Sequence, residues 1–437
     1  MTWYEAGMLM LGGILALMMT GMPVAIAFFT VNIVGALVFM GGIVGIDQFI
    51  ANATDAVTSF TLVPLPLFLL MGELFFHTGL AMRVFDALDK CMGGIRARLS
   101  YLTVGGGTLF AALSGSSMAN TAMLGSLMVP EMTKRGYKPH MITGPIISTG
   151  GLAMIIPPST LAVLLGSLAR IDVGALLIAG LLPGLLLALM YVALIRLQVA
   201  IDPKAAPGYD AEPAGLATIL RALAVDVLPM GFVIFCVIGL ILLGWATPTE
   251  SAAFGALSVL ILAAAYRRLS WEALVKSLRG SLAVTVMMLM IIVGSTTFSQ
   301  ILAFSGASSG VISWATGFEL NPYLVLLAML LLLVVMGMFM DQLSMMMLTL
   351  PVFMPLIQIM GFDPIWFGVV MLLALELSLA TPPFGLLLFI MVGVGPKGTT
   401  LGQVARAAAP YIACTLLLIL LLTAFPQIAL WLPDAMR

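Results

Sequence analysis

Runs of about 20 apolar residues recur along this chain, and they restrict its fold more than any other feature of the sequence. A run of this length crosses a bilayer as one α-helix, because a helix bonds its backbone N–H and C=O groups within the segment. Of the 437 residues, 62% are hydrophobic and 8% are charged, which leaves little material for a soluble domain. We therefore predict an all-α polytopic membrane protein. The predicted spans lie near residues 5–20, 23–43, 62–80, 140–170, 174–199, 226–244, 250–266, 281–303, 364–395 and 408–431.

Two further apolar stretches, residues 99–133 and 322–360, do not fit a simple crossing. Each is too long for one span and too short for two spans with a turn between them. The first carries the polar sequence SGSS in its middle, and the second carries Asp341. We interpret each stretch as a re-entrant helical hairpin, which enters the membrane and returns to the side it came from.

The distribution of basic residues supports the prediction of two hairpins and indicates how the chain is oriented in the membrane. With the N-terminus outside and both hairpins in place, 16 of the 18 Lys and Arg residues fall in cytoplasmic loops. Only Arg170 and Arg437 fall outside. A simple crossing at residues 99–133 would put its two basic flanks on opposite faces, against the positive-inside rule. We therefore predict a periplasmic N-terminus.

The two halves of the chain repeat at a separation of 225 residues. Five predicted spans separate the two hairpins, and an odd number of crossings inverts the second copy. Inverted repeats with broken helices are typical of secondary transporters. The matching positions are Pro130 with Pro355, Gly136 with Gly361, Pro139 with Pro364, and Pro157–Pro158 with Pro382–Pro383.

The repeat divides the chain into five predicted segments. Interfacial arm helices are expected at residues 81–98 and 267–280, although ordinary amphipathic loops would fit these sequences equally well. The segments are N-terminal scaffold helices at 1–61, a first repeat at 62–199 with the hairpin 99–133 and the broken helix 140–170, a cytoplasmic linker at 200–222, scaffold helices and an arm at 223–280, and a second repeat at 281–437 with the hairpin 322–360 and the broken helix 364–395.

Polar residues and helix breakers gather at the hairpin tips and in the broken spans. A break inside the membrane frees backbone N–H and C=O groups, which must then be buried in protein or line a cavity. Pro157 and Pro158 make such a break, and Ser159 and Thr160 add hydroxyl oxygens beside it. Carbonyl, hydroxyl and amide oxygens together suit a hard monovalent cation such as sodium. We predict one cation site in each half, with the substrate between the two tips.

Several ionisable residues at span depth leave two interpretations open. Asp341 takes part in ion binding or gating, or it is exposed to water at the outer face of the membrane. Glu73 and Glu376 are buried partners in the scaffold, or they act in transport. His77 and His140 lie near span ends, where an interfacial position fits them better than a ligand role.

Four stretches of the sequence carry a resemblance to a known family. They are VPLPLFLLMGELFFHTGL at 63–80, GSSMANTAMLGSLMVPEMTKRGYKP at 115–139, the segment 150–188 that contains AMIIPPSTLAV, and ATPPFGLLLF at 380–389. The chain resembles the large membrane subunit of tripartite ATP-independent periplasmic (TRAP) transporters, of the DctM or SiaM type. The resemblance runs across nearly the whole chain.

The resemblance implies a sodium-coupled, elevator-type importer of organic acids in the bacterial inner membrane. C4-dicarboxylates or sialic acid would be typical solutes. A periplasmic solute-binding protein of the DctP or SiaP type would deliver the solute. A small membrane subunit of the DctQ or SiaQ type is expected as a separate chain, because this sequence starts directly with the large subunit.

The resemblance also implies the site residues. The first sodium site would comprise Ser114, Gly115, Ser116, Ser117, Asn120, Ile156, Pro157, Ser159 and Thr160. The second would comprise Gly337, Met340, Asp341, Ser344, Ala380, Thr381, Pro382 and Gly385. Candidates for substrate contact are Ser116, Asn120, Asp341, Ser159, Thr160 and Thr381.

Other functions fit the sequence less well. The stretch GVGPKGTT at 393–400 lacks the Gly-Lys order of a phosphate-binding loop, so an ion gradient rather than ATP is expected to supply the energy. A net charge of −1 gives no basic surface for nucleic acid. No nucleophile–base pair or H-E-x-x-H motif indicates an intramembrane enzyme. The main alternative is a sodium-coupled carboxylate transporter of the same wider superfamily that works without a binding protein.

Overall fold

A computed structural model describes residues 1–208, 215–317, 321–337, 340–382 and 385–436. The described residues form helices and no strand, which confirms the all-α prediction. Seven helical stretches are long and apolar enough to cross a membrane among the described residues. They are Phe60–His77, Val173–Ile201, Leu216–Leu242, Pro248–Ala265, Trp271–Phe304, Gln342–Ile359 and Leu401–Ala424.

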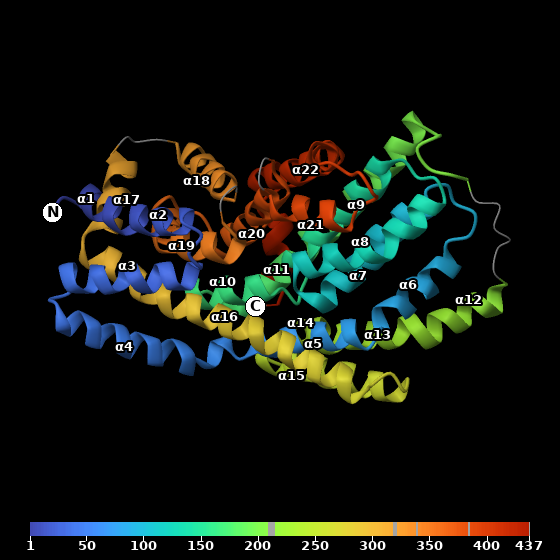
Figure 1. The fold of residues 1–437 in the computed structure, drawn as a ribbon, viewed down its shortest axis with the longest axis horizontal. Helices are drawn as coiled ribbons and strands as arrows, with labels where there is room; N and C mark the ends of the chain where they lie inside the picture. Colours follow the sequence, from blue (N-terminus) through green and yellow to red (C-terminus); the bar gives the residue numbers. More distant parts are fainter. Residues whose placement is uncertain (209–214, 318–320, 338–339, 383–384, 437) are drawn as a thin grey trace.

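One group of helices, here called the scaffold group, fills the lower side of the view in Figure 1. The long helix α16 packs against α3, α4 and α5, and α5 also packs against α15. Asn32 on α3 donates its side-chain amide to the Gly294 carbonyl on α16 at 2.6 Å. The scaffold group consists of α3 (Val24–Phe39), α4 (Ile43–Thr58), α5 (Pro64–His77), α15 (Pro248–Ala265) and α16 (Trp271–Phe304).

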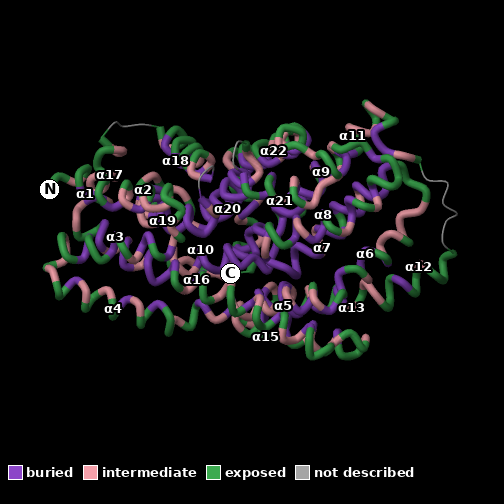
Figure 2. Tube along the Cα trace, viewed as in Figure 1, coloured by how far each residue is buried: buried purple, intermediate pink, exposed green. Residues whose placement is uncertain are grey.

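A second group, here called the repeat group, holds both predicted hairpins and both broken spans. Its members from the first half are α7 (Arg98–Ser114), α8 (Ser117–Lys134), α9 (Pro139–Gly151) and α10 (Thr160–Ala169). Its members from the second half are α18 (Pro322–Met336), α19 (Gln342–Ile359), α20 (Pro364–Ala380) and α21 (Leu386–Val394). Figure 2 shows buried residues concentrated around α7, α10 and α20, whereas α4 at the periphery is largely exposed.

The repeat predicted from the prolines is present in the helix boundaries. A shift of 225 residues carries the first and last residues of α8 onto those of α19, and the start of α9 onto the start of α20. The glycines between these helices also match, because Gly136 has a φ of 79° and Gly361 a φ of 78°. A positive φ of this size favours glycine, which explains why both copies carry it. The inversion of the two halves across a membrane stays a prediction.

Three segments differ from the sequence-based expectation. Residues 267–280 are not a separate arm, because α16 runs without interruption from Trp271 to Phe304 and contains no proline. The predicted linker is shorter than residues 200–222, since α12 (Leu216–Ala222) already begins within it and continues helically to Leu242. Residues 44–61, which separate two of the predicted spans, are mostly helical, because α4 extends from Ile43 to Thr58. The other predicted arm is a separate helix, α6 (Leu80–Cys91).

Two ion pairs connect neighbouring helices near the predicted ends of the spans. Lys138, just before α9, donates to Asp202 at the end of α11 (Val173–Ile201) and lowers the pKa of that carboxyl. Arg83 on α6 pairs with Asp226 at 2.5 Å. The first contact joins the end of α11 to the start of α9, and the second joins the arm helix α6 to the helical stretch Leu216–Leu242.

Helix α11 packs directly on the break that follows α9. A Cβ added at Gly180 would lie 2.3 Å from the Ile155 carbonyl oxygen, and one at Gly184 would lie 2.5 Å from the Ile156 side chain. Contacts this short cannot be tolerated without a shift of the backbone at Ile155. The two glycines on α11 therefore set the position of the break.

We predict that Gly180→Ala destabilises the protein by about 1–3 kcal/mol, because the new methyl group overpacks against a backbone carbonyl. The measurement is the melting temperature of the detergent-solubilised protein. Gly231→Ala is the matched control, since a Cβ at Gly231 in α13 (Leu228–Ile234) meets nothing within 4 Å. Equal melting temperatures for the two variants would contradict the proposed packing.

Candidate functional site

The tip of the first hairpin is a two-residue connection between α7 and α8. Gly115 has a φ of 60°, and a Cβ there would lie 3.1 Å from the Pro158 carbonyl oxygen. Ser116 is the N-cap of α8, and its hydroxyl accepts from the backbone N–H of Ala119 at 3.4 Å. The sequence SGSS therefore ends one helix with glycine and starts the next with a serine cap.

The first broken span touches this tip. Its helices α9 and α10 are separated by a short 3-10 turn and by residues 155–159, which include a cis bond between Pro157 and Pro158. Ser159 caps α10 by accepting from the Ala162 N–H at 3.1 Å. The Thr160 hydroxyl donates to the Gly115 carbonyl oxygen at 2.9 Å. The structure thus brings together the two sets of residues predicted to form the first cation site.

The tip of the second hairpin starts α19 with an acidic cap. Asp341 accepts from the backbone N–H groups of Leu343 at 3.1 Å and Ser344 at 3.4 Å, and also from the Ser344 hydroxyl. At the end of α18, a Cβ on Gly337 would lie 2.3 Å from the Ser378 side chain. This glycine allows the second hairpin to lie against α20. Residues 338–339 of the predicted tip lie outside the described residues.

The second broken span interrupts the helix between α20 and α21. The Thr381 hydroxyl donates to the Leu377 carbonyl oxygen at 2.6 Å, so it is used within its own helix. The Gly385 N–H donates to the Thr381 carbonyl oxygen at 3.2 Å, and a Cβ at Gly385 would lie 2.3 Å from the Leu379 oxygen. Pro382 is exposed, and its predicted partner Pro383 lies outside the described residues.

Both hairpin tips line one cavity of about 500 Å³, here called the tip pocket. The first tip contributes residues 114–117 and the second contributes Asp341 and Gln342. On the opposite wall the scaffold group contributes Glu73 and His77 from α5 and Met288 from α16. The pocket therefore lies between the repeat group and the scaffold group.

A comparison with known protein families identifies the chain. Residues 11–428 match the family described as the DctM component of the tripartite ATP-independent periplasmic transporter. The chain belongs to this family. The resemblance inferred from the sequence motifs is therefore confirmed, and the protein is a multi-pass transporter permease of the inner membrane.

Named relatives cover most of the chain. The C4-dicarboxylate TRAP transporter large permease DctM of Pseudomonas aeruginosa is 33% identical over 86% of this chain and 86% of its own length. The ectoine large permease TeaC of Halomonas elongata is 29% identical, with 98% of each chain covered. The sialic acid large permease SiaM of Vibrio cholerae is 28% identical, with 97% of each chain covered.

Two solved transporters share the fold. The YdaH transporter of Alcanivorax borkumensis aligns with a TM-score of 0.63 at 15% identity, covering 90% of this chain and 89% of its own. MtrF of Neisseria gonorrhoeae aligns with a TM-score of 0.56 at 13% identity, covering 90% and 85%. At these identities the likeness concerns the fold alone, and it supports the assignment of this DctM component to a transporter architecture.

The predicted site residues of this DctM component fall into two sets. Six of them line the tip pocket, namely Ser114, Gly115, Ser116, Ser117, Thr160 and Asp341. The others lie in the tips and breaks but not on the pocket wall, namely Asn120, Ile156, Pro157, Ser159, Gly337, Met340, Ser344, Ala380, Thr381, Pro382 and Gly385. Among the substrate candidates, Asn120, Ser159 and Thr381 thus lie away from the wall of this pocket.

Buried oxygen atoms without partners surround the first tip. Asn120 donates its amide to the carbonyls of Thr149 at 3.2 Å and Gly107 at 3.5 Å, which leaves its side-chain oxygen unpaired. The hydroxyls of Ser114, Thr121 and Thr149 are likewise buried with no hydrogen-bond partner among the described residues. Neutral oxygens of this kind are the ligands that a hard cation requires, so the donor set fits sodium. Thr121 and Thr149 were not predicted from the sequence.

Glu376 joins the two halves of the protein. Its carboxylate accepts from the Ser117 hydroxyl at 3.1 Å and from the Gln342 amide at 3.5 Å. Ser117 and Gln342 are 225 residues apart, so they occupy equivalent positions in the two repeats. The repeat partner of Glu376 is Gly151, whose added Cβ would lie only 1.9 Å from the carboxylate oxygen. One copy thus supplies the carboxylate and the other supplies the space for it.

We predict that Glu376→Leu destabilises the protein by about 1–3 kcal/mol, because the buried Ser117 hydroxyl and Gln342 amide would lose their acceptor. Glu376→Gln is the control, since its amide oxygen can still accept from Ser117. The measurement is again the melting temperature in detergent. A leucine variant as stable as the glutamine variant would show that this contact does not hold the two tips.

Proposed function

We propose that this chain is the large membrane subunit of a sodium-driven importer of organic acids that depends on a periplasmic solute-binding protein. The observation that carries the proposal is the tip pocket, which both repeat-related tips line in a chain that belongs to the DctM family. A cavity of about 500 Å³ is large enough for a small organic acid.

The local chemistry of the tip pocket supports an anionic solute. Helices α8, α10 and α19 all begin at this pocket, with Ser117, Thr160 and Gln342 as their first residues. The unpaired N–H groups at helix N-termini favour a negatively charged ligand. The names of the relatives refer to C4-dicarboxylates, ectoine and sialic acid, which all carry a carboxylate.

Sodium is the proposed coupling ion. In the first half, residues 114–117 and 156–160 would hold it, with the unpaired Ser114 hydroxyl among the ligands. In the second half, the described residues of the tip at 337–344 and of the break at 380–385 would hold it. A bound cation would supply positive charge close to the solute carboxylate, which makes solute binding depend on sodium.

An elevator movement is the proposed mechanism. The tip pocket lies where the repeat group meets the scaffold group, and the facing residues on α16, Met287 and Met288, are apolar. These apolar side chains make no hydrogen bonds that would have to break when one group slides past the other. Such sliding would carry the tips, with solute and sodium, from one side of the membrane to the other.

Two partner proteins complete the proposal. A small membrane subunit of the DctQ or SiaQ type would brace the scaffold group as a separate chain. A binding protein of the DctP or SiaP type would dock at the periplasmic face, on which the N-terminus would also lie. A carboxylate transporter that needs no binding protein is the alternative, and uptake measurements separate the two.

We expect solute uptake into proteoliposomes only when the chain, its small subunit, a cognate binding protein and an inward sodium gradient are all present. The solutes to test are succinate, ectoine and N-acetylneuraminate, each with its binding protein. Omission of the sodium gradient or of the binding protein is the control. Sodium-driven uptake without any binding protein would contradict the tripartite proposal and favour the alternative.

We predict that Asp341→Asn raises the sodium concentration needed for half-maximal uptake at least several-fold, because it removes a charge at the second tip. Asparagine caps a helix about as well as aspartate, so α19 should keep its stability. Asp363→Asn is the matched control, since Asp363 caps α20 in the same way, with N–H contacts at 2.8 and 2.9 Å. Equal sodium dependence in the two variants would refute the role of Asp341.

A further inference from the structure

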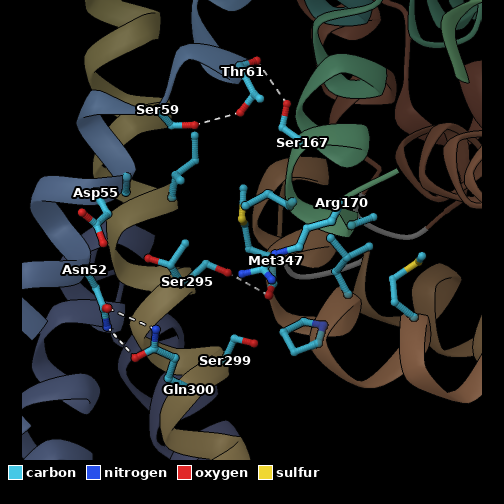
Figure 3. Close-up of a pocket in the computed structure, with 18 of the residues that line it drawn as sticks. Asn52, Asp55, Ser59, Thr61, Ser167, Arg170, Ser295, Ser299, Gln300 and Met347 are labelled. Carbon is cyan, nitrogen blue, oxygen red and sulfur yellow. Dashed lines mark hydrogen bonds between the residues drawn. The ribbon is translucent and has the colours of Figure 1, made fainter. Parts of the chain in front are cut away.

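A second cavity, of about 530 Å³, lies at the same boundary between the two groups of helices. We call it the Arg170 pocket. Figure 3 shows Asn52 and Asp55 of α4 on one side, Ser295, Ser299 and Gln300 of α16 along the wall, and Arg170 opposite them. Its polar lining and its one arginine distinguish it from the more apolar tip pocket.

The two pockets follow one another along the same helices. On α16 the tip pocket ends at Met288 and the Arg170 pocket begins at Ile292, one helical turn or about 6 Å further on. On α10, Thr160 at the start lines the first pocket and Arg170 after the end lines the second. Both cavities therefore belong to one boundary, and they lie at opposite ends of it.

Arg170 is placed to receive an anion. It follows the last residue of α10 with a φ of 55°, and its side chain extends into the cavity in Figure 3. Among the described residues no ion pair or hydrogen bond occupies its guanidinium, and it is the one basic residue on the described wall of this pocket. A free guanidinium binds a carboxylate through two parallel hydrogen bonds.

The wall facing Arg170 is already ordered. Asn52 donates to the Gln300 oxygen at 2.7 Å, and Gln300 donates back to the Asn52 oxygen at 3.1 Å. Ser295 donates to the Met347 carbonyl oxygen at 3.1 Å, which links α16 to α19. Side chains held in this way lose little conformational entropy when a solute binds.

Asp55 gives the pocket a second charge. It lies on the α4 side and forms no ion pair with Arg170. Its carboxylate opposes a second negative charge on the solute, so a dianion should bind less tightly than a solute with one carboxylate. Asp55 therefore predicts that the Arg170 pocket selects against a second negative charge on the solute.

We propose that the Arg170 pocket is a second solute site, which binds the carboxylate of an organic acid at the opposite end of the transport path from the tip pocket. The inference rests on the proposed function, since it takes the solute to be an organic acid. Arg170 holds the carboxylate, and the amides and hydroxyls of α4 and α16 face the rest of the molecule.

Cysteine protection tests the proposal in the complex of this chain with its small subunit. Cys91, Cys236 and Cys414 are first replaced by alanine. A reporter cysteine is then placed in the Arg170 pocket with Ser299→Cys, or in the tip pocket with Ser126→Cys. Labelling by a hydrophilic maleimide is followed against rising succinate, ectoine or N-acetylneuraminate, and uptake is measured on the same preparations.

We expect at least one acid to protect both reporters. Arg170→Gln should raise the acid concentration that protects the Ser299→Cys reporter about ten- to hundred-fold, as expected for lost hydrogen bonds to a charged group. It should leave protection at Ser126→Cys unchanged, which also shows that the variant is folded. Arg267→Gln is the matched control, because Arg267 also follows a helix with a φ of 55° but lies outside both pockets.

Asp55→Asn supplies the opposite change. It should lower the succinate concentration that protects the Ser299→Cys reporter. The protecting concentration of ectoine, which carries one carboxylate, should change less. An unprotected Ser299→Cys reporter, or protection that Arg170→Gln does not weaken, overturns the inference even if uptake is normal. Protection that depends on Arg170, without uptake or tip protection, would support the site and refute the proposed function instead.

Discussion

The need to satisfy backbone polar groups inside a membrane governs this structure. Each helix break in the repeat group frees N–H and C=O groups, and lipid cannot bond these groups. Ser116, Ser159 and Asp341 each cap the helix that follows a break. The caps that make the breaks tolerable also place hydroxyls, a carboxylate and helix N-termini together. The chemistry of the tip pocket is therefore a consequence of how the breaks are stabilised.

The repeat explains the arrangement of the site, but the two copies are not chemically equal. Ser116 and Asp341 occupy equivalent caps, so only one of the two caps carries a charge. Gly151 and Glu376 are also equivalent, and they touch because the copies meet there. A buried carboxylate requires donors, and Ser117 and Gln342 supply one from each copy. Divergence of the repeats thus built a contact that perfect symmetry would have excluded.

The sequence predicted the features that depend on local chemistry. Prolines and glycines reveal breaks and turns, so the register of the repeat, the SGSS tip and the first broken span could all be located before the fold was known. The contact between Glu376 and Ser117 joins residues 259 positions apart, and no local pattern encodes it. The unbroken α16 was missed because basic residues at 267–280 suggested an interfacial segment. Asn52 and Gln300 became a pair only through packing of α4 on α16.

The two pockets together restrict how the helices can move. Both lie along α10, α16 and α19, and about one helical turn of α16 separates the residues that line them. A shift of the repeat group by a few turns would therefore bring the tips to the level of Ser295 and Gln300. The scaffold side offers Glu73, His77 and apolar methionines at one level, and ordered amides and hydroxyls at the other. A solute held by the tips would meet different walls at the two ends, which allows binding and release to differ although the tips themselves are unchanged.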